Sequence, residues 1–133
     1  MSARLIPPVS ELTRPFWEAA SQHTLVLQYC EANDKYVFPP RAHSPWGGGP
    51  LAWKEVSGRG SVYTYTIAHR PPHPVFAQQC PMAIAIVELA EGPRMMTNII
   101  NCDPGDLQVG MSVHVTFEAI DDSDITLPVF EPA

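Results

Sequence analysis

The sequence predicts a mainly β protein in which a small Greek-key barrel is preceded by a short helix and a hairpin. Most patterned segments are short, rich in Val, Ile, Thr and Tyr, and alternate with a period of two, as SVYTYTIA does at 61–68. Fifteen prolines and eight glycines punctuate the chain between them. With 133 residues, of which 45% are hydrophobic, the chain is long enough to fold around one core.

The first element is predicted to be a short helix in TRPFWEAASQH, at 13–23. Thr13 is a residue type that caps helices, and Pro15 is tolerated in a first turn. Phe16 and Trp17 are adjacent, so their rings point to different sides of the helix and cannot share one buried face. We therefore expect one of the two rings to be available to a partner.

Two strands joined by a tight turn are predicted next. TLVLQYC at 24–30 and KYVFPP at 35–40 are rich in strand-forming residues, and the polar EAND between them suits a hairpin turn. The longer stretch CEANDKYVFPPRAHSPWGGG has the layout of a zinc ribbon, yet it contains one cysteine. It is an unusual metal site, a lost metal site, or a loop that only resembles one.

The remaining strands are predicted in LAWKEV, SVYTYTIAHR, MAIAIVELA, RMMTNIIN, MSVHVTFEAI and ITLPVFEP. The segment PPHPVFAQQCP is too rich in proline to pair as a central strand, so it predicts a long loop, where binding residues often lie. Five or six strands without a second helix are typical of the five-stranded OB-fold barrel. We expect an N-terminal arm and helix at 1–23, a zinc-ribbon-like hairpin at 24–52 and an OB-fold domain at 53–133.

Charge and cysteine content narrow the function classes. Lys and Arg total 8 against 14 Asp and Glu, for a formal charge of −6, which disfavours non-specific nucleic-acid binding. Three cysteines and the absence of an apolar signal core at the start predict a cytoplasmic protein with reduced thiols. No apolar run approaches the roughly 18–20 residues that cross a bilayer, so no membrane insertion is expected.

The order of RPFWEAASQHTLVLQYC, YVFPPR, SGRGSVYTYTIAHRP and EGPRMMTNIINCDPGDLQVGM resembles one family over most of the chain, from about Pro15 to Phe130. These are small acyl-CoA-associated proteins, long catalogued as a domain of unknown function, that join an N-terminal helix and a rubredoxin-like zinc ribbon to an OB-fold. The resemblance implies a non-catalytic accessory subunit that helps form the acyl-CoA channel of an enzyme. The implied partner is a thiolase-like acyltransferase or aldolase, or a hot-dog-fold enoyl-CoA hydratase, in fatty acyl or steroid side-chain metabolism.

The chain departs from this family at the zinc ribbon. Placed on the family's frame, the four ligand positions are Cys30, Asn33, Ser44 and Gly47, of which only the first is a residue type that structural zinc favours. The resemblance therefore implies a lost site with no bound metal. Asp34 and His43 remain alternative ligands that would give a Cys-His-Asp site.

Without zinc, something else must hold the ribbon. We expect aromatic packing to do so, because aromatic side chains bury large apolar areas. The expected cluster is Tyr36, Phe38, Trp46 and Trp53.

A second set of candidate residues is expected to contact the partner or its acyl-CoA. In HRPPHPVF the arginine offers a fork for phosphate or carboxylate, the histidines can donate or accept, and the phenylalanine is an apolar anchor on a proline-stiffened loop. The alternative is a solvated linker between two strands. With the helix and the EGPRMMTNI segment, the expected contact residues are Phe16, Trp17, His69, Arg70, His73, Phe76 and Arg94.

Three other functions remain open on the sequence. Cys80 or Cys102 could pair with a histidine as nucleophile and base, although no nucleophile motif is present. OB barrels also bind single-stranded nucleic acid by aromatic stacking, for which Tyr63 and Tyr65 are suitably placed, but the charge of −6 opposes this. A free acyl-CoA carrier would need more cationic groups for the phosphates of coenzyme A.

Overall fold

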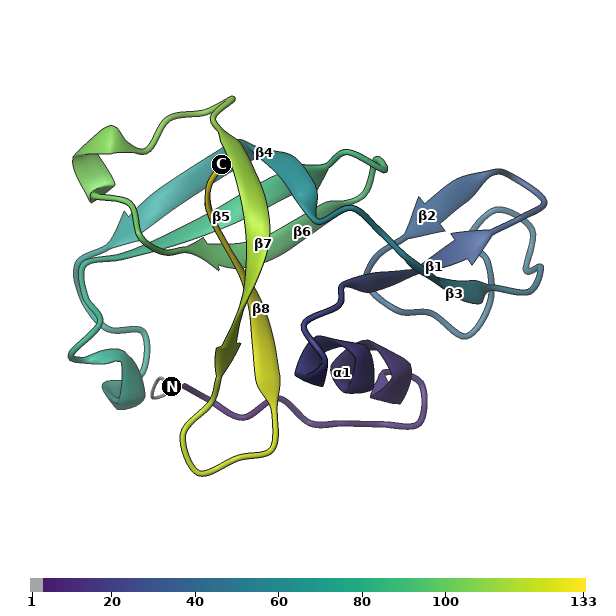
Figure 1. Ribbon diagram of the computed structural model, residues 1–133, viewed down its shortest axis with the longest axis horizontal. Coiled ribbons are helices and arrows are strands. Elements are labelled where there is room, and N and C mark those ends of the chain that lie inside the picture. Colours follow the sequence, from purple (N-terminus) through teal and green to yellow (C-terminus); the bar gives the residue numbers. More distant parts are fainter. Residues whose placement is uncertain (1–3) are drawn as a thin grey trace.

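The computed structural model describes residues 4–133, which form two β units with a helix between them (Figure 1). The smaller unit is a three-stranded sheet in the order β2-β1-β3, and the larger is a closed barrel in the order β4-β5-β6-β8-β7. This confirms the predicted mainly β, OB-fold architecture with one short N-terminal helix. The helix α1 spans Arg14–Ser21 and the strands span Val26–Cys30 (β1), Lys35–Val37 (β2), Ala52–Glu55 (β3), Arg59–Ala68 (β4), Met82–Leu89 (β5), Arg94–Ile99 (β6), Ser112–Ala119 (β7) and Thr126–Pro132 (β8).

The smaller sheet is formed by β1 pairing antiparallel with β2 on one side and β3 on the other. The β1–β2 hairpin turns at the polar residues expected from the sequence. β3 completes this sheet and does not join the barrel, so the boundary suggested at residue 53 lies inside β3.

Strict alternation builds the barrel core. Along β5 every second residue is buried, and β6 buries Met95 and Ile99 in the same way, because successive side chains in a strand point to opposite faces. β8 then lies parallel to β6, with Ile99 opposite Phe130. The buried core includes Leu25, Leu27, Val62, Val87, Leu89, Val113 and Phe130.

A glycine at the start of the barrel allows two elements to approach closely. Gly58 has a φ of +77°, and an added Cβ would lie 2.4 Å from Cγ1 of Val115 on β7. Its carbonyl accepts a hydrogen bond from the N–H of Val115 at 2.8 Å. The SGRG segment at 57–60 therefore contains a left-handed backbone position that packs against β7.

Helix α1 packs against both β1 and β8, so it fills the space between the two β units (Figure 1). Phe16 and Ala20 form its buried face. Thr13 occupies the N-cap position but makes no side-chain capping bond, which corrects the expected role of that residue. Its hydroxyl instead accepts a hydrogen bond from the N–H of Ser10 at 3.0 Å.

Within residues 4–133, none of the helices is long and apolar enough to span a membrane.

Candidate interaction site

The proline-rich loop, residues 69–81, connects β4 to β5 and contains one short 3₁₀ turn at Pro74–Phe76. His73 accepts a hydrogen bond from the N–H of Val75 at its Nδ1 atom, at 3.1 Å, and so caps this turn. His69 and Arg70 are exposed, whereas Phe76 is half-buried. The loop is thus an ordered turn that keeps an aromatic ring against the barrel.

An apolar groove of about 250 Å³ lies between this loop and the outer face of β5, β6 and β8. Met96 on β6 is 70% exposed, while Phe76 and Leu127 come from the loop and from β8. None of the groove-lining side chains within residues 4–133 is charged. The lining residues are Pro72, Phe76, Met82, Ile84, Met96, Thr97, Asn98, Leu127 and Pro128.

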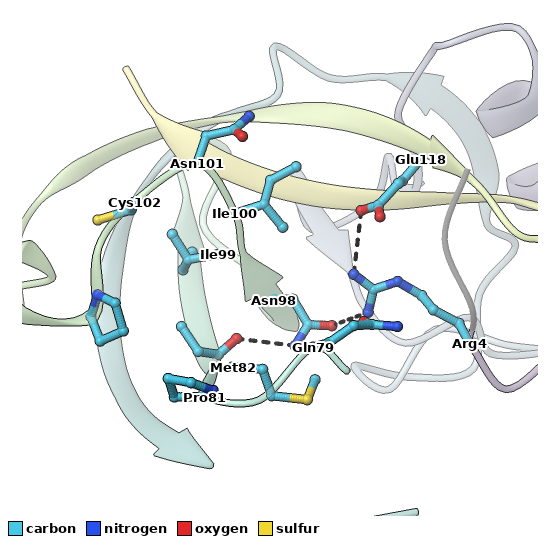
Figure 2. A pocket seen from close by; sticks show the side chains of 12 residues that line it. Arg4, Gln79, Pro81, Met82, Asn98, Ile99, Ile100, Asn101, Cys102 and Glu118 are labelled. Carbon is cyan, nitrogen blue, oxygen red and sulfur yellow. Dashed lines mark hydrogen bonds and ion pairs between the residues drawn. The ribbon is translucent and has the colours of Figure 1, made fainter. Parts of the chain in front are cut away.

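A more polar cavity of about 340 Å³ adjoins the groove and shares Met82 and Asn98 with it. Figure 2 shows Arg4 reaching from the N-terminal arm to Asn98 and Glu118. The guanidinium donates to Oδ1 of Asn98 at 2.6 Å and lies 3.3 Å from Oε2 of Glu118. Because the Arg4 side chain is only 6% exposed, this ion pair fastens the arm to the barrel.

Arg94 does not line the groove. Its guanidinium stacks on the ring of Tyr63, with Cζ 3.8 Å from the ring centroid, and its Nε donates to Glu88 at 3.1 Å. The stacked guanidinium also occupies a ring that single-stranded nucleic acid would use. Arg94 and the proline-rich loop are therefore separate features of the barrel surface.

The two adjacent rings of α1 lie in different environments, Phe16 within the core and Trp17 partly buried against it. Phe16 is 6% exposed and lies in the core, with its ring centroid 6.1 Å from that of Phe38. Trp17 is half-buried and meets the edge of Phe16 in a T-shaped contact. Phe16 is thus a core residue and not a surface contact, because its side of the helix faces the barrel and the smaller sheet.

The four positions that the family resemblance placed at zinc-ligand sites lie in hydrogen-bonded turns. The thiol of Cys30 donates to Oδ1 of Asn33 at 3.3 Å. Ser44 is buried, its hydroxyl accepts from the N–H of Trp46, and its own N–H donates to the carbonyl of Gly49. Gly47 adopts a φ of +120°. These positions are thus occupied by hydrogen-bonded turns of the smaller unit.

The alternative zinc ligands are not gathered into a metal site. The Asp34 carboxylate accepts a hydrogen bond from the Tyr29 hydroxyl, and this bond raises the pKa of Tyr29 to about 12. His43 is exposed. In the part of the chain that the structure describes, no three side chains of His, Cys, Asp or Glu are grouped to hold a metal ion.

The expected aromatic cluster is wrong in one member. Tyr36, Phe38 and Trp53 pack against the core, but Trp46 is 41% exposed and lies under the ammonium of Lys35, 4.9 Å from its ring centroid. The loop is held instead by the buried Gln28 of β1. Its side-chain amide donates to the carbonyl of Arg41 at 2.8 Å and accepts from the Arg41 N–H at 2.7 Å.

Gln28 was missed because glutamine in a predicted strand gives no sign that it is buried. The aromatic side chains that pack against the core from this part of the chain are Tyr36, Phe38 and Trp53. Two hydrogen bonds between Gln28 of β1 and the backbone of Arg41 therefore fasten the loop after β2 to the smaller sheet.

Two described titratable groups of the barrel unit, Cys102 and Glu131, have shifted pKa values. Burial, followed by the nearby Asp106 and Asp103, raises the pKa of the Cys102 thiol, and a raised pKa lowers the thiolate fraction. Near the C-terminal end of the barrel, Asn101 and then His114 hydrogen-bond Glu131 and lower the pKa of its carboxyl group. These interactions act on packing and charge and do not assemble a base next to a thiol.

In the comparison with known proteins, a family match covers the barrel strands β4 to β7. Residues 53–118 match the family described as ChsH2, C-terminal OB-fold domain. The chain is also 42% identical over 130 residues to a probable enoyl-CoA hydratase alpha subunit of Thermomonospora curvata. That match covers 95% of this chain and 39% of the relative, so the chain spans less than half the length of that protein.

Two further relatives match along nearly their whole length. A DUF35 domain-containing scaffold protein of Methanocaldococcus jannaschii is 34% identical over 121 residues, covering 86% of this chain and 85% of the relative. Among solved structures, a chain of the aldolase described as Ltp2-ChsH2(DUF35) has a TM-score of 0.85 and 38% sequence identity. That superposition covers 96% of this chain and 98% of the matched chain.

Proposed function

This chain belongs to the DUF35 family, and from that premise we propose that it is a non-catalytic accessory subunit of an acyl-CoA-processing enzyme. The proposed partner is a thiolase-like aldolase or acyltransferase, or an enoyl-CoA hydratase, that acts on a fatty acyl or steroid side-chain thioester. The names of the similar proteins support both kinds of partner. We place this complex in the cytoplasm, in keeping with the few cysteines and their free thiols.

The observation that supports this proposal best is the uncharged apolar groove beside the proline-rich loop. Met96 exposes 70% of its surface there, and a flexible thioether adapts well to an apolar partner surface. Phe76 is presented by a loop whose prolines and 3₁₀ turn reduce the entropy lost on docking. An apolar face with a pre-ordered aromatic anchor is what a protein interface requires.

We infer from the charge distribution that the acyl group and the coenzyme A group of the thioester contact different subunits. The groove has no charged side chain among its described lining residues, so it suits an acyl chain or the apolar wall of a channel. The phosphates of coenzyme A need cations, and the exposed His69 and Arg70 stand at the start of the proline-rich loop that borders the groove. The partner therefore supplies most of the coenzyme A site, and this chain supplies part of the channel wall.

The test is affinity purification of the chain from its native host, followed by reconstitution with the enzyme that co-elutes. Met96→Asp places a charge in the apolar groove and is expected to weaken the complex at least tenfold, since burying an unpaired charge is costly. Val109→Asp is the matched control, because Val109 is 67% exposed on the loop between β6 and β7. Recovery of this chain alone from cells that express a thiolase-like enzyme and a hydratase would contradict the proposal.

A further inference from the structure

The N-terminal arm, residues 4–13, presents a row of large apolar side chains to solvent. Leu5, Ile6, Val9 and Leu12 are each between 40% and 55% exposed. Between positions 5 and 12 the only charged residue is Glu11. Apolar side chains that stand together on a surface commonly mark an interaction site.

The arm is fixed at both ends although it has no regular secondary structure between residues 4 and 10. At one end the buried Arg4 guanidinium binds Asn98 and Glu118. Asn98 is itself oriented, because its amide donates to the carbonyl of Ala83 at 3.0 Å. The apolar row therefore begins at a rigid point on the barrel.

At the other end a reciprocal turn joins the arm to α1. The N–H of Ser10 donates to the Thr13 hydroxyl at 3.0 Å, and the N–H of Thr13 donates to the Ser10 hydroxyl at 3.2 Å. The N–H of Arg14 also donates to the carbonyl of Ser10 at 2.9 Å. These bonds use the polar groups of the turn locally and leave the apolar side chains facing outward.

The prolines at positions 7 and 8 determine how such a segment can bind. Proline fixes φ and has no N–H, so Pro7 and Pro8 stiffen the arm and remove two donors that a strand addition would need. Stiff, extended, proline-containing segments instead dock by their side chains into apolar or aromatic-lined grooves. The arm loses little conformational entropy when it does so, because it is already ordered.

We propose that residues 5–12 form a pre-organised strap that docks into an uncharged apolar groove of the enzyme partner, as a second contact beside the groove of this chain. The inference rests on the proposed function for the identity of the partner. Arg4 lines the polar cavity that shares Met82 and Asn98 with the groove, so the strap begins beside a cavity that adjoins the groove. The strap has no basic side chain to match an anionic lipid surface or nucleic acid.

The experiment uses the reconstituted complex of the full chain with its enzyme. Leu5→Ser and Ile6→Ser are each expected to raise Kd about tenfold, since each removes an apolar side chain that is roughly half exposed before docking. Arg4→Met keeps the apolar row but releases its anchor, and is expected to raise Kd about threefold to tenfold by loss of pre-organisation. Amide hydrogen exchange at positions 5, 6, 9 and 12 is expected to slow in the complex.

Val109→Ser is the matched control and should leave Kd unchanged, because its equally exposed side chain lies outside the strap. Thermal unfolding of each variant confirms that the fold is retained. If Met96→Asp weakens the complex while the strap variants and the exchange rates do not change, the strap is refuted and the proposed function stands. If no complex forms, both are refuted.

Separate measurements on the same variants test two other binding partners for the strap, a second copy of this chain and a lipid surface. A concentration-dependent doubling of mass in light scattering that Ile6→Ser abolishes would assign the strap to a second copy of this chain. Sedimentation of the free chain with phosphatidylcholine vesicles that Ile6→Ser abolishes would assign it to a lipid surface. Either result would overturn the proposal.

Discussion

Replacing Gly58 with alanine tests the packing that joins the smaller sheet to the barrel. Two costs add. A φ of +77° is strained for an L residue by about 1–2 kcal/mol. The new Cβ would also lie 2.4 Å from Cγ1 of Val115, and overpacking of this kind costs about 1–3 kcal/mol. We therefore expect Gly58→Ala to lower the free energy of unfolding by about 2–5 kcal/mol.

Two other glycines separate these costs. Gly92 has a φ of +114° and Gly105 has no left-handed φ, and neither has an atom within 4 Å of an added Cβ. Gly92→Ala should show only the backbone cost, and Gly105→Ala should change stability by less than about 0.5 kcal/mol. Unfolding in urea followed by circular dichroism measures all three.

A second substitution checks the assigned cause. Val115→Ala removes the Cγ1 atom, so in the Gly58→Ala background it should restore part of the lost stability beyond the sum of the single effects. If Gly58→Ala is as stable as Gly105→Ala, or if Val115→Ala shows no coupling to it, the close approach of β7 to this glycine is not a determinant of the fold.

Three further predictions concern charge, metal and nucleic acid. Glu131 has a lowered pKa in the folded chain, so its stabilising effect is present at neutral pH and is lost as the pH falls through that pKa. Glu131→Gln should thus lower the melting temperature at pH 7, and this loss should disappear once the pH is below the lowered pKa; an equal loss at neutral and strongly acidic pH would contradict this. Elemental analysis should find well under one zinc atom per chain, and zinc at one atom per chain would refute the lost site. Gln28→Ala removes the two hydrogen bonds to the backbone of Arg41 and should lower the melting temperature. Filter binding of a labelled single-stranded oligonucleotide at low salt should show no retention, and tight, salt-sensitive retention would favour the nucleic-acid function.

Part of the strand content of this chain was predictable because residue types alternate with a period of two, and in β5 and β6 burial alternates in the same way. SVYTYTIA and MAIAIVELA show a period of two, and a barrel strand with one buried face requires that pattern. The proline-rich loop was predictable for the converse reason, since proline cannot donate to a ladder. Phe76 at the candidate site followed from the proline-rich signal of its loop.

The choice between Phe16 and Trp17 could not be made from the helix alone. Adjacent residues on a helix point to different sides, and only the packing of α1 against β1 and β8 determines which side is buried. The burial of Trp46 was predicted wrongly for a similar reason, because the exposure of its side chain depends on how the loop after β2 folds. Where the period of the sequence does not show which side chains are buried, only the assembled fold determines their burial.

The sequence by itself determined the mainly β class, the short helix, the proline-rich loop between the fourth and fifth predicted strands, and the presence of Asn, Ser and Gly at positions 33, 44 and 47. These depend on residue type and short-range period. The tertiary structure alone decided that Leu127 lies at the same groove as Met96, and that Arg4 pairs with Glu118. Such contacts join residues that are far apart in the chain, and they exist because barrel closure places β8 between β6 and β7.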